Sequence, residues 1–239
     1  MAEEIKIRLN KYISEAGICS RRQADKLIEQ GEIRVDGKVA DLGTRVDGHS
    51  IVEYNGRRLY PASKTVIYAY NKPIGQVCTS ADADVDSIFN KVEFPERVYY
   101  VGRLDKDSSG LLLLTNDGDL ANMIQKARNG HEKEYHVRVN RDISEAFIKG
   151  MEEGVPILDT VTKKCRVKKT GTRSFSIILT QGLNRQIRRM CDYFGYRVVH
   201  LKRVRVMNVR LGDLRPGAYR ILTEDEEKLL RNMAEGVKK

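Results

Sequence analysis

The segment of residues 99–120 places two aspartates, an arginine and a lysine between two short apolar runs, VYYVG and GLLLLT. Short apolar runs bounded by glycine are typical of buried strands, so the charged residues are expected in a loop held at the edge of the core. A carboxylate held there beside a cation can act as a nucleophile or as a general base. The segment is therefore a candidate catalytic loop, although an aspartate in such a loop often only accepts hydrogen bonds from turn amides.

A resemblance to a known family makes this interpretation specific. Residues 102–118 fill every fixed position of the motif G-R-L-D-x-D-[ST]-x-G-L-[LI]-[LF]-L-T-N-[DH]-G, and the segments EKEYHVRV and GLNRQIRRM follow in the expected order with the patterns K-x-Y and Q-[IL]-R. The chain thus resembles the RsuA-type family of ribosomal RNA pseudouridine synthases over nearly its whole length. It is most similar to the RluF branch, in GVPILDTVTKKCRVKK and QGLNRQIRRMCDYFGYRV.

The resemblance implies three catalytic residues: Asp105, Tyr135 and Arg188. Pseudouridine formation breaks the N1–C1′ bond of a uridine and joins C5 to C1′, so the base must be flipped out of the RNA. Asp105 is expected to act at the ribose, as nucleophile or as base, and Arg188 to keep its carboxylate ionised. Tyr135 is expected to stack on the uracil and to help remove the C5 proton. Without the motif, Tyr135 is an ordinary core aromatic and Arg188 an exposed helix arginine.

Helical spacing suggests how the arginines near residue 188 are arranged. A helix over NRQIRRMCDYFG, with Asn184 as its N-cap, would bury the stripe Ile187, Met190, Cys191 and Phe194. Arg188 then lies on the flank of the buried stripe, while Arg185 and Arg189 point outward, where they would suit phosphates. The complete set expected to bind RNA is Arg21, Arg22, Lys72, Arg103, Lys133, Arg185, Gln186 and Arg189.

The first 62 residues predict a small separate module of two helices followed by short strands. Helical spacing runs through RLNKYISEAG, Ser20 and Gln23 form a capping-box pattern for a second helix, and Asp-Gly and Asn-Gly pairs predict two hairpins. RLNKYISEAGICSRRQADKLIEQGEIRVDGKVA resembles the S4-type RNA-binding domain. Arg21 and Arg22 would lie in the first turn of the second helix, where the helix dipole disfavours cations. Either they are tolerated at the surface, or an RNA phosphate binds there.

Pro61 and its neighbours predict a linker, after which residues 66–239 form a second domain. Strands and helices mix there without a regular alternation, which indicates an α+β fold around a mostly antiparallel sheet. The expected organisation is an RNA-binding domain over residues 1–62 and a catalytic pseudouridine synthase domain over residues 66–239.

Composition indicates an anionic partner. The net charge is +10, and residues 163–210 carry fourteen Lys and Arg against one acid, Asp192. Such a bias often means only a solvated face, but here the basic residues are spread over several expected elements, which favours a groove for RNA. No apolar run is long enough for a membrane span, and no amphipathic helix offers a large apolar face, so no membrane partner is expected.

Cofactors are not expected either. The four cysteines are far apart and form no C-x-x-C pair, so neither a zinc site nor a disulfide framework is indicated. Neither G-x-x-x-x-G-K-[ST] nor G-x-G-x-x-G after a strand occurs, so no nucleotide cofactor is expected. A monomer acting in the cytoplasm is the plain expectation.

Two other functions fit parts of the pattern. DKDSS after an apolar strand matches D-x-D-x-[ST], the nucleophile motif of haloacid-dehalogenase-like phosphatases, but later carboxylate pairs for Mg²⁺ are missing from the sequence. A non-catalytic RNA-binding factor of ribosome assembly would use the basic face equally well, but would gain nothing from an acid in a basic groove. For a synthase of this family, the expected substrate is large-subunit ribosomal RNA, with transfer RNA as a second candidate.

Overall fold

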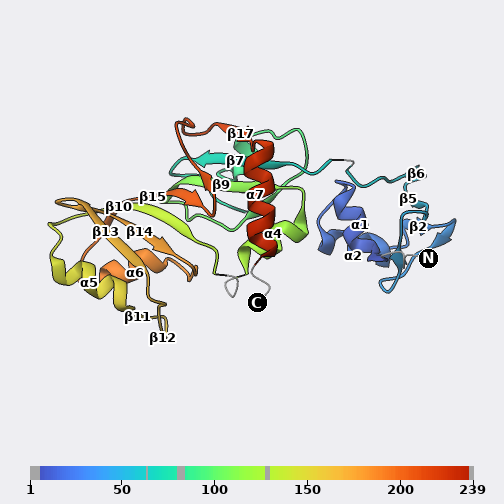
Figure 1. Ribbon diagram of the computed structural model, residues 1–239. Helices are drawn as coiled ribbons and strands as arrows, with labels where there is room; N and C mark the ends of the chain where they lie inside the picture. Colours follow the sequence, from blue (N-terminus) through green and yellow to red (C-terminus); the bar gives the residue numbers. More distant parts are fainter. Residues whose placement is uncertain (1–5, 63, 80–83, 127–129, 237–239) are drawn as a thin grey trace. The chain divides into compact units, whose positions relative to one another are not determined.

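The computed structural model describes residues 6–62, 64–79, 84–126 and 130–236 (Figure 1). The chain divides into two compact units, Met1–Thr65 and Val66–Lys239. Each unit has its own buried apolar cluster, so each is described by itself.

Two helices form the first part of the small unit, α1 (Leu9–Glu15) and α2 (Arg21–Glu29). The predicted capping box begins α2: the amide of Gln23 donates to the hydroxyl of Ser20, and the amide of Ser20 donates to the side chain of Gln23. The helices pack together through buried apolar residues on their facing sides, including Leu9, Ile13 and Ile28.

The strands of the small unit are β1 (Ile7–Arg8), β2 (Ile33–Val35), β3 (Lys38–Val39), β4 (Arg45–Val46), β5 (Val52–Tyr54) and β6 (Arg57–Arg58). Four of them form an antiparallel sheet in the order β3-β2-β5-β6, and β1 pairs with β4. Both predicted hairpins are confirmed. Their Asp36-Gly37 and Asn55-Gly56 turns have positive φ at both central residues, which matches the right-handed twist of the strands they join.

The large unit is built on a nine-stranded sheet: β7 (Ile67–Lys72), β8 (Tyr99–Val101), β9 (Ser109–Thr115), β10 (Lys133–Val139), β13 (Arg166–Gly171), β14 (Ser174–Leu179), β15 (Val198–Val206), β16 (Val209–Arg210) and β17 (Tyr219–Ile221). The order along the sheet is β13-β14-β10-β15-β9-β7-β17, with β16 on β15 and β8 on β9. Among the described strand pairs of this sheet, only β9 and β15 are parallel. The predicted α+β fold around a mostly antiparallel sheet is therefore confirmed.

The parallel pair joins two halves of the sheet that are buried differently. In the half with β7 and β9, α4 (Gly118–Gln125) and α7 (Glu224–Glu235) cover one face, and α3 (Ile88–Lys91) helps to cover the other. Because both faces are covered, Leu111 to Leu114 are all fully buried. This explains the continuous apolar run in the sequence.

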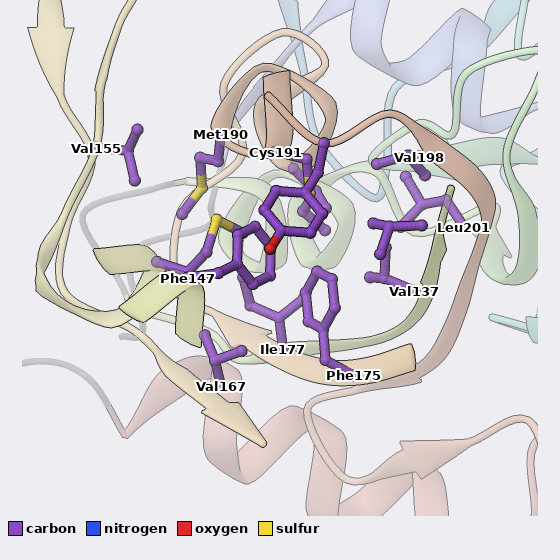
Figure 2. Close-up of a cluster of buried hydrophobic side chains, with 14 of the residues drawn as sticks. Val137, Phe147, Val155, Val167, Phe175, Ile177, Met190, Cys191, Val198 and Leu201 are labelled. Carbon is purple, nitrogen blue, oxygen red and sulfur yellow. The ribbon is translucent and has the colours of Figure 1, made fainter. Parts of the chain in front are cut away.

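The other half buries one face. There α5 (Glu145–Glu153) and α6 (Gln186–Tyr193) pack on β10, β13, β14 and β15. Figure 2 shows this core, in which the rings of Phe147 and Phe175 meet with centroids 5.5 Å apart, and Met190 and Cys191 come from α6. A small separate hairpin, β11 (Pro156–Ile157) and β12 (Thr160–Val161), follows α5.

Helix α6 begins later than its sequence indicated. Its N-cap is Arg185, with φ of +50° in the left-handed region and no side-chain cap, whereas Asn184 was the predicted N-cap. The side chain and carbonyl of Asn184 instead accept hydrogen bonds from Arg189. Phe194, expected in the buried stripe, is the C-cap residue and is only partly buried.

The backbones of the two halves approach closely at Gly110, which generates the first prediction. A Cβ on this residue would lie 2.2 Å from the carbonyl oxygen of Arg203, and φ is +101°. Gly110→Ala should therefore lower the free energy of unfolding by at least about 2 kcal/mol, measured by chemical denaturation. Gly118→Ala, in open space at the start of α4, is the control and should not lower stability. Equal stability of the two variants would contradict the close approach.

Candidate active site

Asp105 lies in the tight loop between β8 and β9, directly before the parallel junction. Leu104 and Ser108 on either side of it are buried, the amide of Leu104 donates to the Sγ of Cys78 at 3.5 Å, and the amide of Ser108 donates to the carbonyl of Asp105 at 3.0 Å. The side chain of Asp105 itself is 37% exposed. The loop thus fixes the backbone around an accessible carboxylate, as the sequence predicted.

Two arginines of the α6 region contact this loop, but not in the predicted way. Arg185 donates to both carboxylate oxygens of Asp107, at 3.1 and 2.9 Å, and lies 3.8 Å from the carboxylate of Asp105. Arg188 donates to the carbonyl of Asp107 at 2.8 Å, and its Nε lies 3.3 Å from the Asp107 carboxylate. The predicted pairing of Arg188 with Asp105 is therefore not present.

The unexpected start of α6 accounts for this difference. Because Arg185 lies outside the helix in a left-handed conformation, the helical spacing that pointed it outward does not apply to it. Its hydrogen bonds lower the pKa of Asp107 below the ordinary value, against an opposing effect of burial, and Arg188 lowers it further. Asp107 is thus ionised at neutral pH and ties both arginines to the loop.

Tyr135 lies on the same side of the sheet as this loop. It is half-buried on β10, opposite Ile177 of β14 and Arg203 of β15. Its ring packs against the core under α5 and α6 and also against the cluster that contains Leu104. Tyr135 therefore stands where the two halves of the sheet meet, beside the loop that carries Asp105.

Two residues expected to bind RNA are buried. Lys72 is 0% exposed, and its ammonium donates to the carbonyls of Pro73 and Gln76, both at 2.8 Å. Gln186 is 4% exposed, and its side-chain oxygen accepts the amide of Leu183. The structure contradicts an RNA contact for both, because their polar atoms are engaged inside the protein.

Two further cations lie beside Tyr135, of which Lys133 is half-buried and Arg203 is buried. Burial, and then the charge of Arg203, lower the pKa of Lys133 to about 8. Arg203 is 2% exposed, and its Nε donates to the carbonyl of Leu111 at 2.7 Å. It was counted in the sequence only as part of the basic segment. The available signal was strand alternation, which places a charged residue on the inward face of β15 two positions after buried Leu201.

The remaining candidates are exposed. Arg21 and Arg22 stand in the first turn of α2, where no acidic residue offsets them. Arg103 is exposed at the start of the loop, and Arg189 is exposed on α6 although it bonds to Asn184. These four side chains are accessible to a bound polyanion.

Comparison with known proteins agrees with this geometry. A model of the RNA pseudouridylate synthase family matches residues 66–193, and a model of the S4 domain matches residues 7–52. The chain belongs to the RNA pseudouridylate synthase family. It is 52% identical to the dual-specificity RNA pseudouridine synthase RluF of Salmonella typhi, over 99% of this chain and 82% of the relative.

More distant relatives of this synthase are also similar to it over nearly the whole chain. It is 35% identical to the ribosomal large subunit pseudouridine synthase B of Bacillus subtilis (strain 168), over 95% of this chain and 97% of the relative. A crystal structure of a pseudouridylate synthase is similar with a TM-score of 0.69 at 27% identity, covering 94% of this chain and 99% of the other. The predicted RsuA-type family and the S4-type domain are confirmed.

The relatives decide between the functions that the sequence left open. The protein is an RNA pseudouridine synthase, not a phosphatase or a non-catalytic assembly factor. Within the described ranges, no three His, Cys, Asp or Glu side chains are grouped to hold a metal ion. No helix of the described chain is long and apolar enough to cross a membrane.

The burial of Lys133 generates a prediction about stability. The pKa of Lys133 falls from 10.5 in the unfolded chain to about 8 in the folded synthase. Below pH 8, folding therefore moves a charged ammonium out of water, which lowers the stability of the folded state. Lys133→Met should therefore raise the free energy of unfolding at pH 7 by about 1–3 kcal/mol. The gain should shrink between pH 8 and 10.5, because the folded wild type loses its proton there before the unfolded chain does.

Urea denaturation of both proteins across this pH range is the measurement. Lys202→Met, at an exposed position of β15, is the control and should change stability little at any pH. A loss of stability in Lys133→Met at pH 7 would contradict the burial of a charged ammonium.

Proposed function

We propose that this synthase isomerises a uridine in structured large-subunit ribosomal RNA, with a transfer RNA as its second substrate. The names of the relatives support this choice: RluF is a dual-specificity RNA synthase, and the Bacillus subtilis relative acts on the large ribosomal subunit. The observation that carries the proposal is the accessible Asp105 carboxylate on a buried loop, beside Arg185 and facing the half of the sheet that holds Tyr135.

Asp105 acts on the ribose of the flipped uridine. Its carboxylate is the nucleophile or the base that assists cleavage of the N1–C1′ bond, after which C5 of the uracil bonds to C1′. The product regains its aromatic ring when the C5 proton leaves and N1 gains a proton, so no cofactor or metal is consumed. The rigid backbone at Leu104 and Ser108 lowers the cost of placing the carboxylate at C1′.

Tyr135 and Arg188 have different tasks. Tyr135 stacks on the flipped uracil, and its hydroxyl assists removal of the C5 proton. Arg188 is a positioning residue, because its guanidinium contacts Asp107 and the loop backbone. Arg185 supplies the positive charge nearest to the carboxylate of Asp105.

The first unit, residues 1–62, binds RNA and tethers the catalytic domain, residues 66–239. Arg21 and Arg22 offer their charges at the N-terminus of α2, where the free helix amides also favour a phosphate. Arg103 and Arg189 bind the RNA backbone next to the site. The synthase acts as a cytoplasmic monomer without a nucleotide cofactor.

Substitution of the two aspartates tests the assignment of the catalytic group. Asp105→Asn keeps the shape but removes the anion, so pseudouridine formation should be abolished while RNA affinity changes only a few-fold. Asp107→Asn should retain measurable activity, because the amide oxygen still accepts one hydrogen bond from Arg185. Single-turnover assays at saturating enzyme separate chemistry from binding. Turnover by Asp105→Asn, or an equal loss in Asp107→Asn, would place the catalytic carboxylate elsewhere.

Removal of the first unit tests the tether. A protein lacking residues 1–62 should stay folded, since residues 66–239 have their own core, but should modify RNA poorly at low concentration. Its rate should recover at saturating enzyme. Arg21→Ala combined with Arg22→Ala in the full chain is the matched control and should weaken RNA binding in the same direction. Unchanged affinity in both proteins would exclude a targeting role for the first unit.

A further inference from the structure

Arg203 is a buried cation with an unused donor. Its side chain is 2% exposed, its Nε is bound to the carbonyl of Leu111, and its Nη2 has no hydrogen-bond partner in the part of the chain that the structure describes. No ion pair of Arg203 with a carboxylate is present among the described residues either. Burial of a charged donor without a partner is unfavourable, so a ligand that accepts this hydrogen bond would remove that penalty.

Arg203 is the cross-strand neighbour of Tyr135, the residue proposed to stack on the uracil. Arg203 of β15 stands opposite Tyr135 of β10, so the two side chains share one face of the sheet. Lys133 lies on the same face, two residues before Tyr135 on a strand whose pairing with β14 is regular. Lys133 is near enough to Arg203 for the two charges to repel, and its ammonium donates only to the carbonyl of His131, at 3.3 Å, among the described groups.

The guanidinium also lies close to the catalytic loop. Burial raises the pKa of the Cys78 thiol, and Lys72 and Arg203 are among the nearby cations that act against this shift. The same thiol accepts the amide of Leu104, directly before Asp105. Arg203 therefore stands within electrostatic reach of the loop on one side and of Lys133 on the other, with Tyr135 as its neighbour across the sheet.

We infer that the free Nη2 of Arg203, together with the ammonium of Lys133, binds the carbonyl oxygens of the flipped uracil and stabilises the negative charge of the base as it leaves the ribose. This inference rests on the proposed function. When the N1–C1′ bond breaks, its electron pair stays on the uracil, where the charge spreads over N1, O2 and O4. Preorganised cations in a dry site stabilise such a charge most strongly.

The neighbouring cations are less suited to this task. Lys72 is 0% exposed and already donates to two backbone carbonyls, and Arg185 and Arg188 are engaged with Asp107. Arg203 keeps its charge at any working pH, and its planar fork uses one donor for Leu111 while leaving another free. Arg203 moves no proton in this step, so the proton that leaves C5 and the proton that N1 gains are handled by other groups.

The test compares full-length wild type with Arg203→Met on RNA in which the target uridine is unmodified, 2-thiouridine or 4-thiouridine. Sulfur accepts hydrogen bonds weakly, so the thio substitution removes the acceptor without moving C5. With uridine, Arg203→Met should lower the single-turnover rate about 10²–10³-fold while RNA affinity stays within a few-fold. With one of the two thio RNAs, the ratio of wild-type to variant rates should fall by about tenfold or more.

Two further variants serve as a control and as a replacement for Arg203→Met. Arg205→Met, two residues along β15 and paired with Glu132 and Glu134, is the matched control and should show the same rate ratio on all three RNAs. Arg203→Lys keeps a positive charge and replaces Arg203→Met if the latter does not fold; its rate ratio should fall in the same RNA to a smaller degree.

The inference is overturned if the rate ratio is the same for all three RNAs, or if Arg203→Met loses RNA affinity without losing rate. The second result would indicate a phosphate contact. Failure of the proposed function looks different, because the wild type would then form no pseudouridine in ribosomal or transfer RNA, or Asp105→Asn would stay active.

Discussion

Arg185 and Arg188 hold the loop that carries Asp105, and the geometry of the site depends on this contact. Both guanidinium groups converge on Asp107, and Arg188 also binds its backbone carbonyl. The side chain of Arg188 is only 11% exposed, so its interaction with the loop is screened less than a surface ion pair. Arg185 adopts a left-handed conformation that costs free energy, and its two hydrogen bonds to Asp107 offset that cost.

The sheet brings these groups together. Ser109 and Gly110 pair in parallel with Lys202 and Arg203, which joins the half that carries the Asp105 loop to the half that carries α6 and Tyr135. This junction needs a glycine, because a Cβ at position 110 would overlap the backbone of Arg203. Arg203, which pairs with Gly110 at this junction, also pairs with Tyr135 on the other side of β15. Strand β15 therefore both joins the two halves of the sheet and carries Arg203 next to Tyr135.

Much of the local structure could be predicted from short sequence patterns. The capping box at Ser20, the two hairpins and the rigid loop around Asp105 follow from short-range chemistry, and the structure has all of them. The partner of Arg185 could not be predicted, because it depends on one backbone angle at the start of α6. A spacing of 100° per residue applies only inside a helix.

The burial of polar and charged residues could not be predicted from the sequence either. Lys72 and Gln186 match the pattern of RNA-binding side chains, yet the tertiary packing encloses them and engages their polar atoms. The sequence analysis did not distinguish Arg203 from the other residues of the basic segment. Its burial depends on pairing with strands more than sixty residues away in sequence. Such non-local contacts decide whether a cation faces solvent, lines a site or supports its walls.

Hydrogen exchange at the amide of Ser108 tests the hold of α6 on the loop most directly. This amide donates to the carbonyl of Asp105, so its protection reports on the turn itself. In Arg188→Met, we expect its exchange to become at least about tenfold faster than in wild type, while the amides of Leu112 and Leu113 in β9 keep their protection. Unchanged exchange at Ser108 in this variant would show that the loop is rigid without the arginine, and would contradict the account.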